Sequence, residues 1–329
     1  MTSDSQSESI KLTVDAEADG QRIDRYLSGL FSTFSRTVLQ KAISAGGVQV
    51  NGHNVKPSHK LTTGEIVNVR LPEEPDSDVK PEAIPLDIVY EDDALVVVNK
   101  AAGMIVHPGK SHHTGTLAGA LQHHFDTLSD AAGKQRPGIV HRLDRDTTGI
   151  IVIARSNLVH HHLSRQFEQR TVKKEYRALV NGEMNLDADH ITTHIKVDPK
   201  KRERMVICDP EPNSNSREAA TYYEVTERFR GYSHVALLPK TGRTHQLRVH
   251  MQHVGHPLIA DRMYRGGGAL NRQDLNHGEP NEILIRRHAL HAFRLSFDHP
   301  ESGERVTFEA PLAEDMQRTL TALREHRSR

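Results

Sequence analysis

The stretch GIVHRLDRDTTGIIVIA, residues 138–154, places a short polar loop between two apolar runs. The runs Gly138–Val140 and Ile150–Ala154 are short and rich in β-branched residues, a pattern typical of strands buried in a sheet. The loop between them carries one histidine, two arginines and two aspartates. Buried strands on both sides hold such a loop rigidly enough to support chemistry. This stretch therefore predicts a sheet and a candidate site.

The two aspartates of this loop fit different roles. Asp146 suits an ordinary turn, because an aspartate ahead of threonine and glycine can bond its own backbone. Asp144, between Leu143 and Arg145, is not needed for the turn, which favours a functional carboxylate. On local chemistry alone, a solvated turn is the alternative for both residues.

A second polar stretch, Thr241–His250, runs from a loop into a predicted helix with a basic first turn. Positive charge at a helix N-terminus is unfavourable because of the helix dipole. Arg243 and Arg248 therefore predict an anionic partner, either a phosphate or a carboxylate. A solvated basic helix is the alternative.

The rest of the chain predicts many strands and few helices. Apolar runs predict further strands at Leu86–Tyr90, Ala94–Asn99, Tyr176–Val180, Ala220–Thr226 and Ser233–Leu238. Helical periodicity occurs at Thr116–His124, Leu158–Gln169 and Thr244–Val254. Because strands and helices do not alternate regularly, the sequence predicts an α+β fold rather than repeated βαβ units.

The length of 329 residues predicts about two domains. Residues 1–20 are polar and acidic and predict a disordered tail. Residues 21–71 predict a small α/β domain of two helices and a hairpin, and Asn51-Gly52 is a typical hairpin turn. The acidic, proline-rich stretch 72–85 predicts a linker. The second domain is predicted at 86–323.

The net charge is zero, but the charges are segregated along the chain. Residues 22–70 hold seven Lys or Arg against two acids, whereas residues 71–93 hold nine acids and one Lys. A basic block followed by an acidic connector favours a nucleic-acid-binding module on a tether, although charge alone also fits a chance patch. The candidate contacts with a nucleic-acid backbone are Arg22, Arg25, Arg36 and Lys41.

Cysteine content and hydropathy narrow the class of protein. The single cysteine, Cys208, allows neither an intrachain disulfide nor a cysteine-based zinc site. No apolar run approaches the roughly 20 residues that span a bilayer, and the first twenty residues hold no apolar signal segment. We therefore expect a cytoplasmic protein with no membrane partner.

Several short motifs, in a fixed order along the chain, resemble those of the RluA/RluD-type RNA pseudouridine synthases. They are Gly138–Gly149, Gly242–His250 with Gly255–Leu258, Lys173–Tyr176, Arg287–Ala292, Phe308–Leu312, Leu86–Asp93 and Ile105–Gly109. The resemblance runs from about residue 83 to 316. Residues 22–70 resemble the small RNA-binding domain shared with ribosomal protein S4.

The resemblance implies a fold and a reaction. The fold is a mixed, mainly antiparallel sheet with peripheral helices, preceded by the small RNA-binding domain. The family converts uridine in RNA to 5-ribosyluracil and needs no metal, nucleotide or redox cofactor. The subtype most similar in sequence implies 23S-type ribosomal RNA or a ribosomal assembly intermediate as partner, with a transfer RNA substrate as the alternative. A monomer is expected.

The resemblance also assigns roles to residues. Asp144 matches the essential aspartate, whose role is debated between attack on the sugar or base and proton abstraction from the ribose. Tyr176 is the candidate stacking platform, with its hydroxyl near carbon 5, and without the resemblance a core tyrosine is the alternative. Arg248 is expected to pair with Asp144, and a separation above about 6 Å would refute this pairing.

Four further residues are expected around the substrate. Leu247 walls the uracil pocket, whereas the arginines contact phosphates or hold the flipped nucleotide, with a surface salt bridge as the alternative for each. These arginines are Arg142, Arg145 and Arg243. Two segments, 205–219 and 264–282, depart from the family pattern and predict surface loops.

Two rival functions were weighed. The 23 histidines could supply metal ligands, but none stands in a His-Glu-x-x-His pattern, so no metal site is expected. The basic N-terminal block alone would also fit a noncatalytic RNA-binding protein. The joint presence of Asp144, Tyr176 and Arg248 favours the enzyme.

Overall fold

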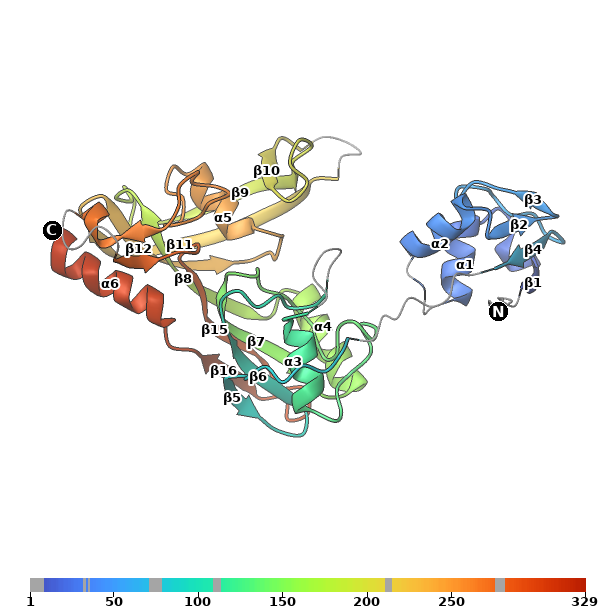
Figure 1. Ribbon diagram of the computed structural model, residues 1–329, viewed down its shortest axis with the longest axis horizontal. Helices are drawn as coiled ribbons and strands as arrows, with labels where there is room; N and C mark the ends of the chain where they lie inside the picture. Colours follow the sequence, from blue (N-terminus) through green and yellow to red (C-terminus); the bar gives the residue numbers. More distant parts are fainter. Residues whose placement is uncertain are drawn as a thin grey trace, which may run out of the picture. The chain divides into compact units, whose positions relative to one another are not determined.

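The computed structural model describes residues 9–31, 34, 36–70, 79–108, 114–210, 215–275 and 282–329, without the side chain of Thr37. The chain divides into two compact units, Met1–Asp78 and Val79–Arg329 (Figure 1). No helix in the described part of the chain is long and apolar enough to cross a membrane.

The first unit is a four-stranded antiparallel sheet with two helices. The sheet order is β1-β4-β2-β3, and its strands are β1 (Ile10–Thr13), β2 (Val48–Val50), β3 (His53–Asn54) and β4 (Ile66–Val69). The helices are α1 (Ile23–Leu30) and α2 (Arg36–Ser44), with a short 3-10 turn, η1, at Ala16–Ala18. Asn51 and Gly52 both have positive φ, as a type I′ hairpin turn requires.

The predicted disordered tail is wrong for residues 10–20. Ile10–Thr13 form β1, which pairs with β4, and Val14 is only 2% exposed. The alternation of apolar and polar residues in β1 is too short to stand out in an acidic segment, and its burial comes from the partner strand. Residues 1–8 lie outside the described residues.

The structure also differs from the predicted linker, residues 72–85, over its second half. Val79 is 5% exposed in the core of the second unit, and the Glu82 carboxylate accepts hydrogen bonds from the Gly115 N–H at 3.0 and 2.9 Å. Residues 79–85 therefore belong to the second unit. Residues 71–78 lie outside the described residues.

The second unit is built on a ten-stranded sheet. Its order is β10-β9-β11-β12-β8-β15-β7-β6-β5, with β16 paired to β15. β15 runs parallel to β7, and the other pairings among its described strands are antiparallel. The strands are β5 (Ile88–Glu91), β6 (Leu95–Lys100), β7 (Thr148–Ala154), β8 (Lys173–Asn181), β9 (Ala188–Val197), β10 (Met205–Cys208), β11 (Arg217–Phe229), β12 (Tyr232–Pro239), β15 (Leu290–Asp298) and β16 (Arg305–Glu309).

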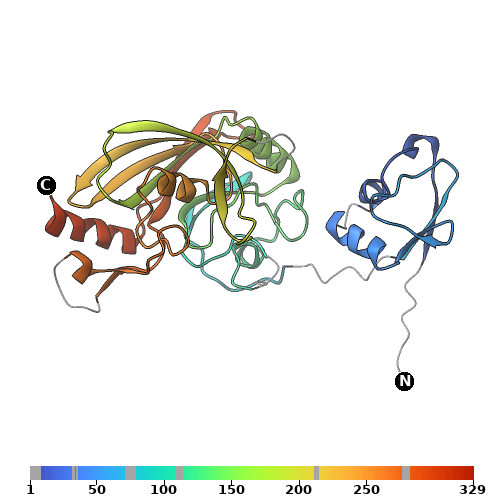
Figure 2. The same cartoon turned by 90° about the horizontal axis from the view of Figure 1, so that it is seen from above.

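Helices lie at the periphery of this sheet (Figures 1 and 2). They are α3 (Leu117–His124), α4 (Asn157–Glu168), α5 (Gln246–His253) and α6 (Glu314–Arg327). A small pair of strands, β13 (Leu270–Asn271) and β14 (Ile283–Ile285), and the 3-10 turn η2 (Arg272–Leu275) lie beside α6. The predicted α+β class with a mainly antiparallel sheet is confirmed.

β6 and β7 are buried on both faces, which explains their continuous apolar sequence. Alternate residues such as Val96 and Ile151 pack with α3, whereas Val97 and Val152 pack with α4. The predicted strand Gly138–Val140 is wrong, because this segment forms only a single bridge, Ile139 to Ile153, after a turn at Gly138.

Gly149 ends the polar loop where β7 meets β15. Its φ is +110°, and a Cβ there would lie 2.2 Å from the Ala292 carbonyl oxygen. A larger residue would force the two strands apart. The close approach of β7 and β15 therefore fixes the position at which the loop that carries Asp144 re-enters the sheet.

Candidate active site

Segments distant in sequence meet at a cleft of about 560 Å³ in the second unit. The loop before β7 contributes Asp144, β8 contributes Tyr176, and α5 contributes Leu247 and Arg248. Apolar walls come from Val140, Leu143, Val172 and Leu290. The structure thus brings together the three residues that the sequence predicts to be catalytic.

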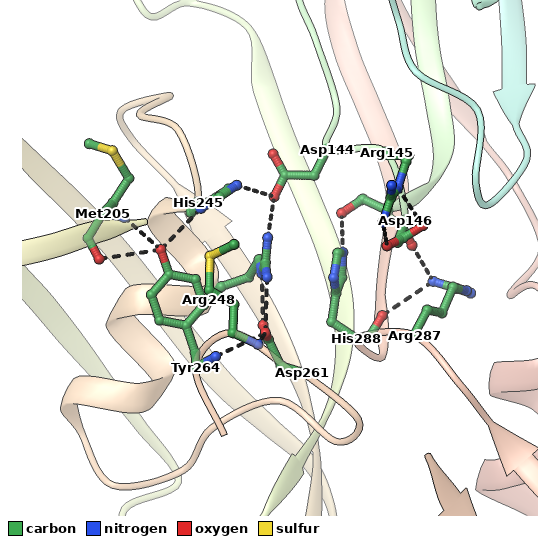
Figure 3. A network of polar contacts seen from close by, with 12 residues as sticks. Asp144, Arg145, Asp146, Met205, His245, Arg248, Asp261, Tyr264, Arg287 and His288 are labelled. Carbon is green, nitrogen blue, oxygen red and sulfur yellow. Dashed lines mark hydrogen bonds and ion pairs between the residues drawn. The ribbon is translucent and has the colours of Figure 1, made fainter. Parts of the chain in front are cut away.

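Arg248 joins two aspartates (Figure 3). Its Nη1 donates to Asp144 Oδ2 at 3.2 Å, which confirms the predicted pairing. Its Nε and Nη2 donate to Asp261 Oδ2 and Oδ1 at 2.7 and 2.9 Å. The Asp261 side chain is 0% exposed, Arg248 8% and Asp144 19%. The bidentate pair with Asp261 fixes the guanidinium plane and leaves one nitrogen for the carboxylate that faces the cleft.

Charge balance keeps Arg248 and Asp261 ionised. Burial works to lower the pKa of Arg248, but its hydrogen bonds and attraction to Asp261, and then to Asp144, raise it above its ordinary value. Burial likewise works to raise the pKa of Asp261, and the hydrogen bonds and charge of Arg248 bring it below its usual range. Asp261 was missed by the sequence analysis, because no local pattern marks it as the buried partner of α5.

His245 lies beside the pair in a strained conformation. It precedes α5 with φ +54°, in the left-handed region that non-glycine residues seldom adopt. Its Nδ1 lies 3.0 Å from the Tyr264 hydroxyl, and its Nε2 lies 3.8 Å from Asp144 Oδ2, beyond hydrogen-bond range. Burial lowers the pKa of His245, which keeps the ring neutral at pH 7.

Buried polar side chains hold the backbone of the Asp144 loop. Lys100 is 1% exposed, and its Nζ donates to the carbonyl of Arg145 at 2.9 Å. Arg287 Nη1 donates to the carbonyl of Asp146 at 2.9 Å, and His288 Nε2 lies 2.8 Å from Thr147 Oγ1 (Figure 3). Successive residues after Asp144 are therefore each anchored, which limits movement of the carboxylate.

Tyr176 and Leu247 form part of the apolar wall of the cleft. Tyr176 packs against two core clusters, and Leu247 is 6% exposed. Burial, followed by the negative charge of Asp144, raises the pKa of Tyr176 well above its ordinary value. The side chain therefore remains a neutral phenol next to the carboxylate.

The three predicted phosphate-binding arginines do not share one position. Arg142 and Arg243 line the cleft, and Arg243 Nε also donates to the Glu218 carbonyl at 3.1 Å. Arg145 is outside the cleft lining and pairs with Asp146 at 3.2 Å. Lys174, which was not predicted as a site residue, also lines the cleft. Burial and the nearby Arg170 and Arg243 lower its pKa to about 8.

In the first unit, Asp24 organises two of the predicted RNA-binding arginines. The Asp24 side chain is 0% exposed and pairs with Arg22 and Arg36, each at 3.0 Å, while Gln40 Nε2 donates to it at 2.6 Å. The two arginine side chains are 46% and 50% exposed. Hydrogen bonds from Arg22, with smaller contributions from Gln40 and Arg36, hold the pKa of Asp24 far below its usual range against the effect of burial. Arg25 and Lys41 are exposed.

His250 of α5 has structural partners. His250 is 0% exposed and lies between Thr221 Oγ1 at 2.9 Å and Thr193 Oγ1 at 3.0 Å. Over the ranges that the structure describes, no three His, Cys, Asp or Glu side chains form a group that could hold a metal ion.

A carboxylate steadied by a buried arginine, facing a cleft with an apolar wall and a cationic rim, defines an enzyme site for an anionic substrate. Comparison with known proteins gives the family. Residues 94–253 match the family described as RNA pseudouridylate synthase, and residues 21–67 match the S4 domain. The chain belongs to the RNA pseudouridine synthase family and carries an S4 domain at its N-terminal end, which confirms the resemblance found in the sequence.

Relatives match over nearly the full length of the chain. The uncharacterized RNA pseudouridine synthase YlyB of Bacillus subtilis is 40% identical over 317 residues, covering 96% of this chain and 99% of the relative. Ribosomal large subunit pseudouridine synthase D of Neisseria meningitidis serogroup B is 42% identical over 316 residues, covering 96% and 82%. The solved structure of human RNA pseudouridylate synthase domain containing 4 has a TM-score of 0.55 at 27% identity, covering 72% of this chain and 92% of that one.

Proposed function

We propose that this enzyme isomerises specific uridines of large-subunit ribosomal RNA to pseudouridine, using Asp144 and no cofactor. The observation that carries the proposal is the position of Asp144. Its carboxylate faces the cleft, is 19% exposed and accepts a hydrogen bond from the buried Arg248. This arrangement supplies a fixed negative charge at the place where a ribose and its base would bind.

The reaction balances without a co-reactant. The bond between N1 of the uracil and C1′ of the ribose breaks, a bond from C5 to C1′ forms, C5 loses its proton and N1 gains one. An ionised Asp144 serves this reaction whether it attacks the sugar or base or removes a ribose proton. In each version, Arg248 holds the carboxylate in place while the base rotates.

The target nucleotide must leave its stack before it enters the cleft. Unstacking costs a few kcal/mol, and stacking on an aromatic ring returns about 1–3 kcal/mol. Tyr176 offers that ring, Leu247 a neighbouring apolar surface, and Arg142 and Arg243 the charges for the strand. A neutral phenol at Tyr176 also places a polar hydroxyl near carbon 5 without adding a second negative charge.

The proposed RNA follows from the relatives and the S4 domain. Several relatives are named ribosomal large subunit pseudouridine synthase D, including those of Neisseria meningitidis and Xylella fastidiosa. In the first unit, Arg22, Arg25, Arg36 and Lys41 would contact the phosphate backbone. Such contacts add affinity and salt dependence but little sequence choice, so the second unit must select the uridine.

Two measurements test this proposal. The purified protein should release tritium from large-subunit ribosomal RNA labelled at carbon 5 of uridine, and pseudouridine mapping in cells that lack the protein should show lost positions in that RNA. Release from transfer RNA alone would overturn the proposed substrate. Binding without release from any RNA would favour the noncatalytic RNA-binding alternative.

A further inference from the structure

A second groove, of about 910 Å³, adjoins the catalytic cleft. Arg142, Leu143, Asp144, His245 and Arg248 line both cavities, so the two are continuous around the Asp144 carboxylate. Most of the remaining lining comes from three segments, within residues 102–107, 260–263 and 286–288. The lining also includes Arg145, Asp146, Glu203 and Asp315.

Most carboxylates of this groove are already paired within the protein. Asp261 is held by Arg248 at 2.7 Å, Asp315 by Arg287 at 2.7 Å, and Asp146 by Arg145 at 3.2 Å. Asp144 also accepts from Arg248. Glu203 is the remaining acid in the groove lining, and it is exposed.

Three arginines of the groove stand in contrast. Arg142, Arg262 and Arg286 are exposed, and no hydrogen bond or ion pair of their side chains occurs among the contacts of the described residues. Six arginines and five acids line the groove, and three of the arginines have no protein partner among the described residues, so these three favour an anionic occupant.

His107 also lines the groove. Its Nδ1 is buried and has no hydrogen-bond partner within the described part of the chain. Burial, and then the charges of Arg136 and Arg142, lower the pKa of His107 to about 4, so the ring is neutral at pH 7. A neutral imidazole beside free arginines suits a ligand that carries hydroxyl groups as well as negative charge.

We propose that this groove binds the RNA strand adjacent to the target nucleotide, and that Arg262 and Arg286 each contact a phosphate. The inference rests on the proposed function, because it takes the nucleotide in the cleft as the start of that strand. A free small anion would need only one guanidinium, whereas a phosphodiester chain leading away from the cleft uses several.

The test is the variant R262Q/R286Q in the full-length protein. Each phosphate contact with a single strand contributes about 0.7 to the slope of log affinity against log salt, so the slope should decrease by about 1.4. At 0.15 M salt, this corresponds to an increase of about tenfold in Kd and KM for RNA. Because neither arginine contacts Asp144 or Arg248, kcat should stay within about twofold of the wild type.

The matched control is R165Q/R230Q, which removes two exposed charges that line neither cavity. If R262Q/R286Q matches this control in slope and KM, or if it loses kcat at unchanged KM, the groove proposal is overturned. An inactive wild type would refute the proposed reaction instead. The change in salt slope would then still identify the groove as an RNA site.

Discussion

Each unit of this protein has a cluster of aspartate and arginine around a buried carboxylate, and the two clusters have opposite stoichiometry. In the first unit, Asp24 holds two arginines, whose side chains remain about half exposed. In the second unit, Arg248 is buried and holds two aspartates, of which Asp144 faces the cleft. The first cluster presents positive charge outward, and the second presents a carboxylate.

We propose that the same kind of ion pair serves RNA binding in the first unit and chemistry in the second. A surplus of arginine, with its planes fixed by Asp24, is suited to meeting phosphates with little loss of side-chain entropy. A surplus of carboxylate, steadied by a guanidinium that Asp261 already orients, is suited to acting on a sugar. The comparison therefore predicts that changes in the first cluster alter RNA affinity, whereas changes in the second alter turnover.

The largest combined effect on stability and turnover is expected for Asp261→Ala. Removing one partner of a buried pair typically destabilises a protein by about 3–5 kcal/mol, because the other charge is left unpaired. Arg248 would also lose the orientation that points Nη1 at Asp144. We expect a lower melting temperature and a loss of kcat, measured by calorimetry and tritium release. Asp261→Asn, which keeps one acceptor oxygen, should be intermediate, and wild-type turnover in both variants would contradict the role of Asp261.

Tyr176→Phe should retain RNA binding and lose much of the turnover. The ring still packs in the wall of the cleft, so Kd should change by less than about threefold, whereas the missing hydroxyl slows the step at carbon 5. The measurement is single-turnover tritium release alongside filter binding. An equal loss of binding and turnover would instead indicate a packing role.

Asp24→Ala tests the first cluster in the same way as Asp261→Ala tests the second. Arg22 and Arg36 lose their shared anchor, so RNA affinity should fall a few-fold and kcat at saturating RNA should be unchanged. Hydrogen exchange of the full chain should show lower protection in residues 9–70 than in the wild type. A selective loss of kcat would remove the proposed division between binding and chemistry.

The smallest of these effects is expected when the pH is raised, and it is a change in KM for RNA. Lys174 has a pKa lowered to about 8, so it is charged below that pH and becomes neutral as the pH rises through 8. The cleft then loses one positive charge, and KM for RNA should rise about two- to fourfold between pH 7 and 9, in line with a single phosphate contact. Lys174→Met carries no charge at either pH, so its KM should already be raised at pH 7 and should stay raised at pH 9. A wild-type KM that falls over this range would contradict the assignment.

The pairing of Asp144 with Arg248 was predictable from sequence because both lie in recognisable motifs. Asp261 was not, because its burial depends on α5, which packs over it only in the folded chain. α6 was missed because Glu314–Arg327 is rich in charge, and its apolar contacts are limited to a narrow stripe such as Met316, Leu320 and Leu323. Sequence patterns thus located the candidate reacting groups, whereas the partners that fix them arise from long-range packing.

β9 and β10 show the same limit. Ala188–Val197 and Met205–Cys208 contain few fully buried residues, so their hydrophobic pattern is weak. β9 becomes a strand because it pairs with β11, and β10 becomes a strand because it pairs with β9. The predicted surface loop 205–219 accordingly contains β10 and the start of β11, and residues 211–214 lie outside the described residues.

The most direct measurement of the central claim is single-turnover tritium release by Asp144→Asn at saturating RNA. The amide keeps the size of the side chain and removes its charge, so RNA should bind with a Kd within about threefold of the wild type while release falls to background. Release at a rate comparable to the wild type would show that the carboxylate held by Arg248 is not the reacting group.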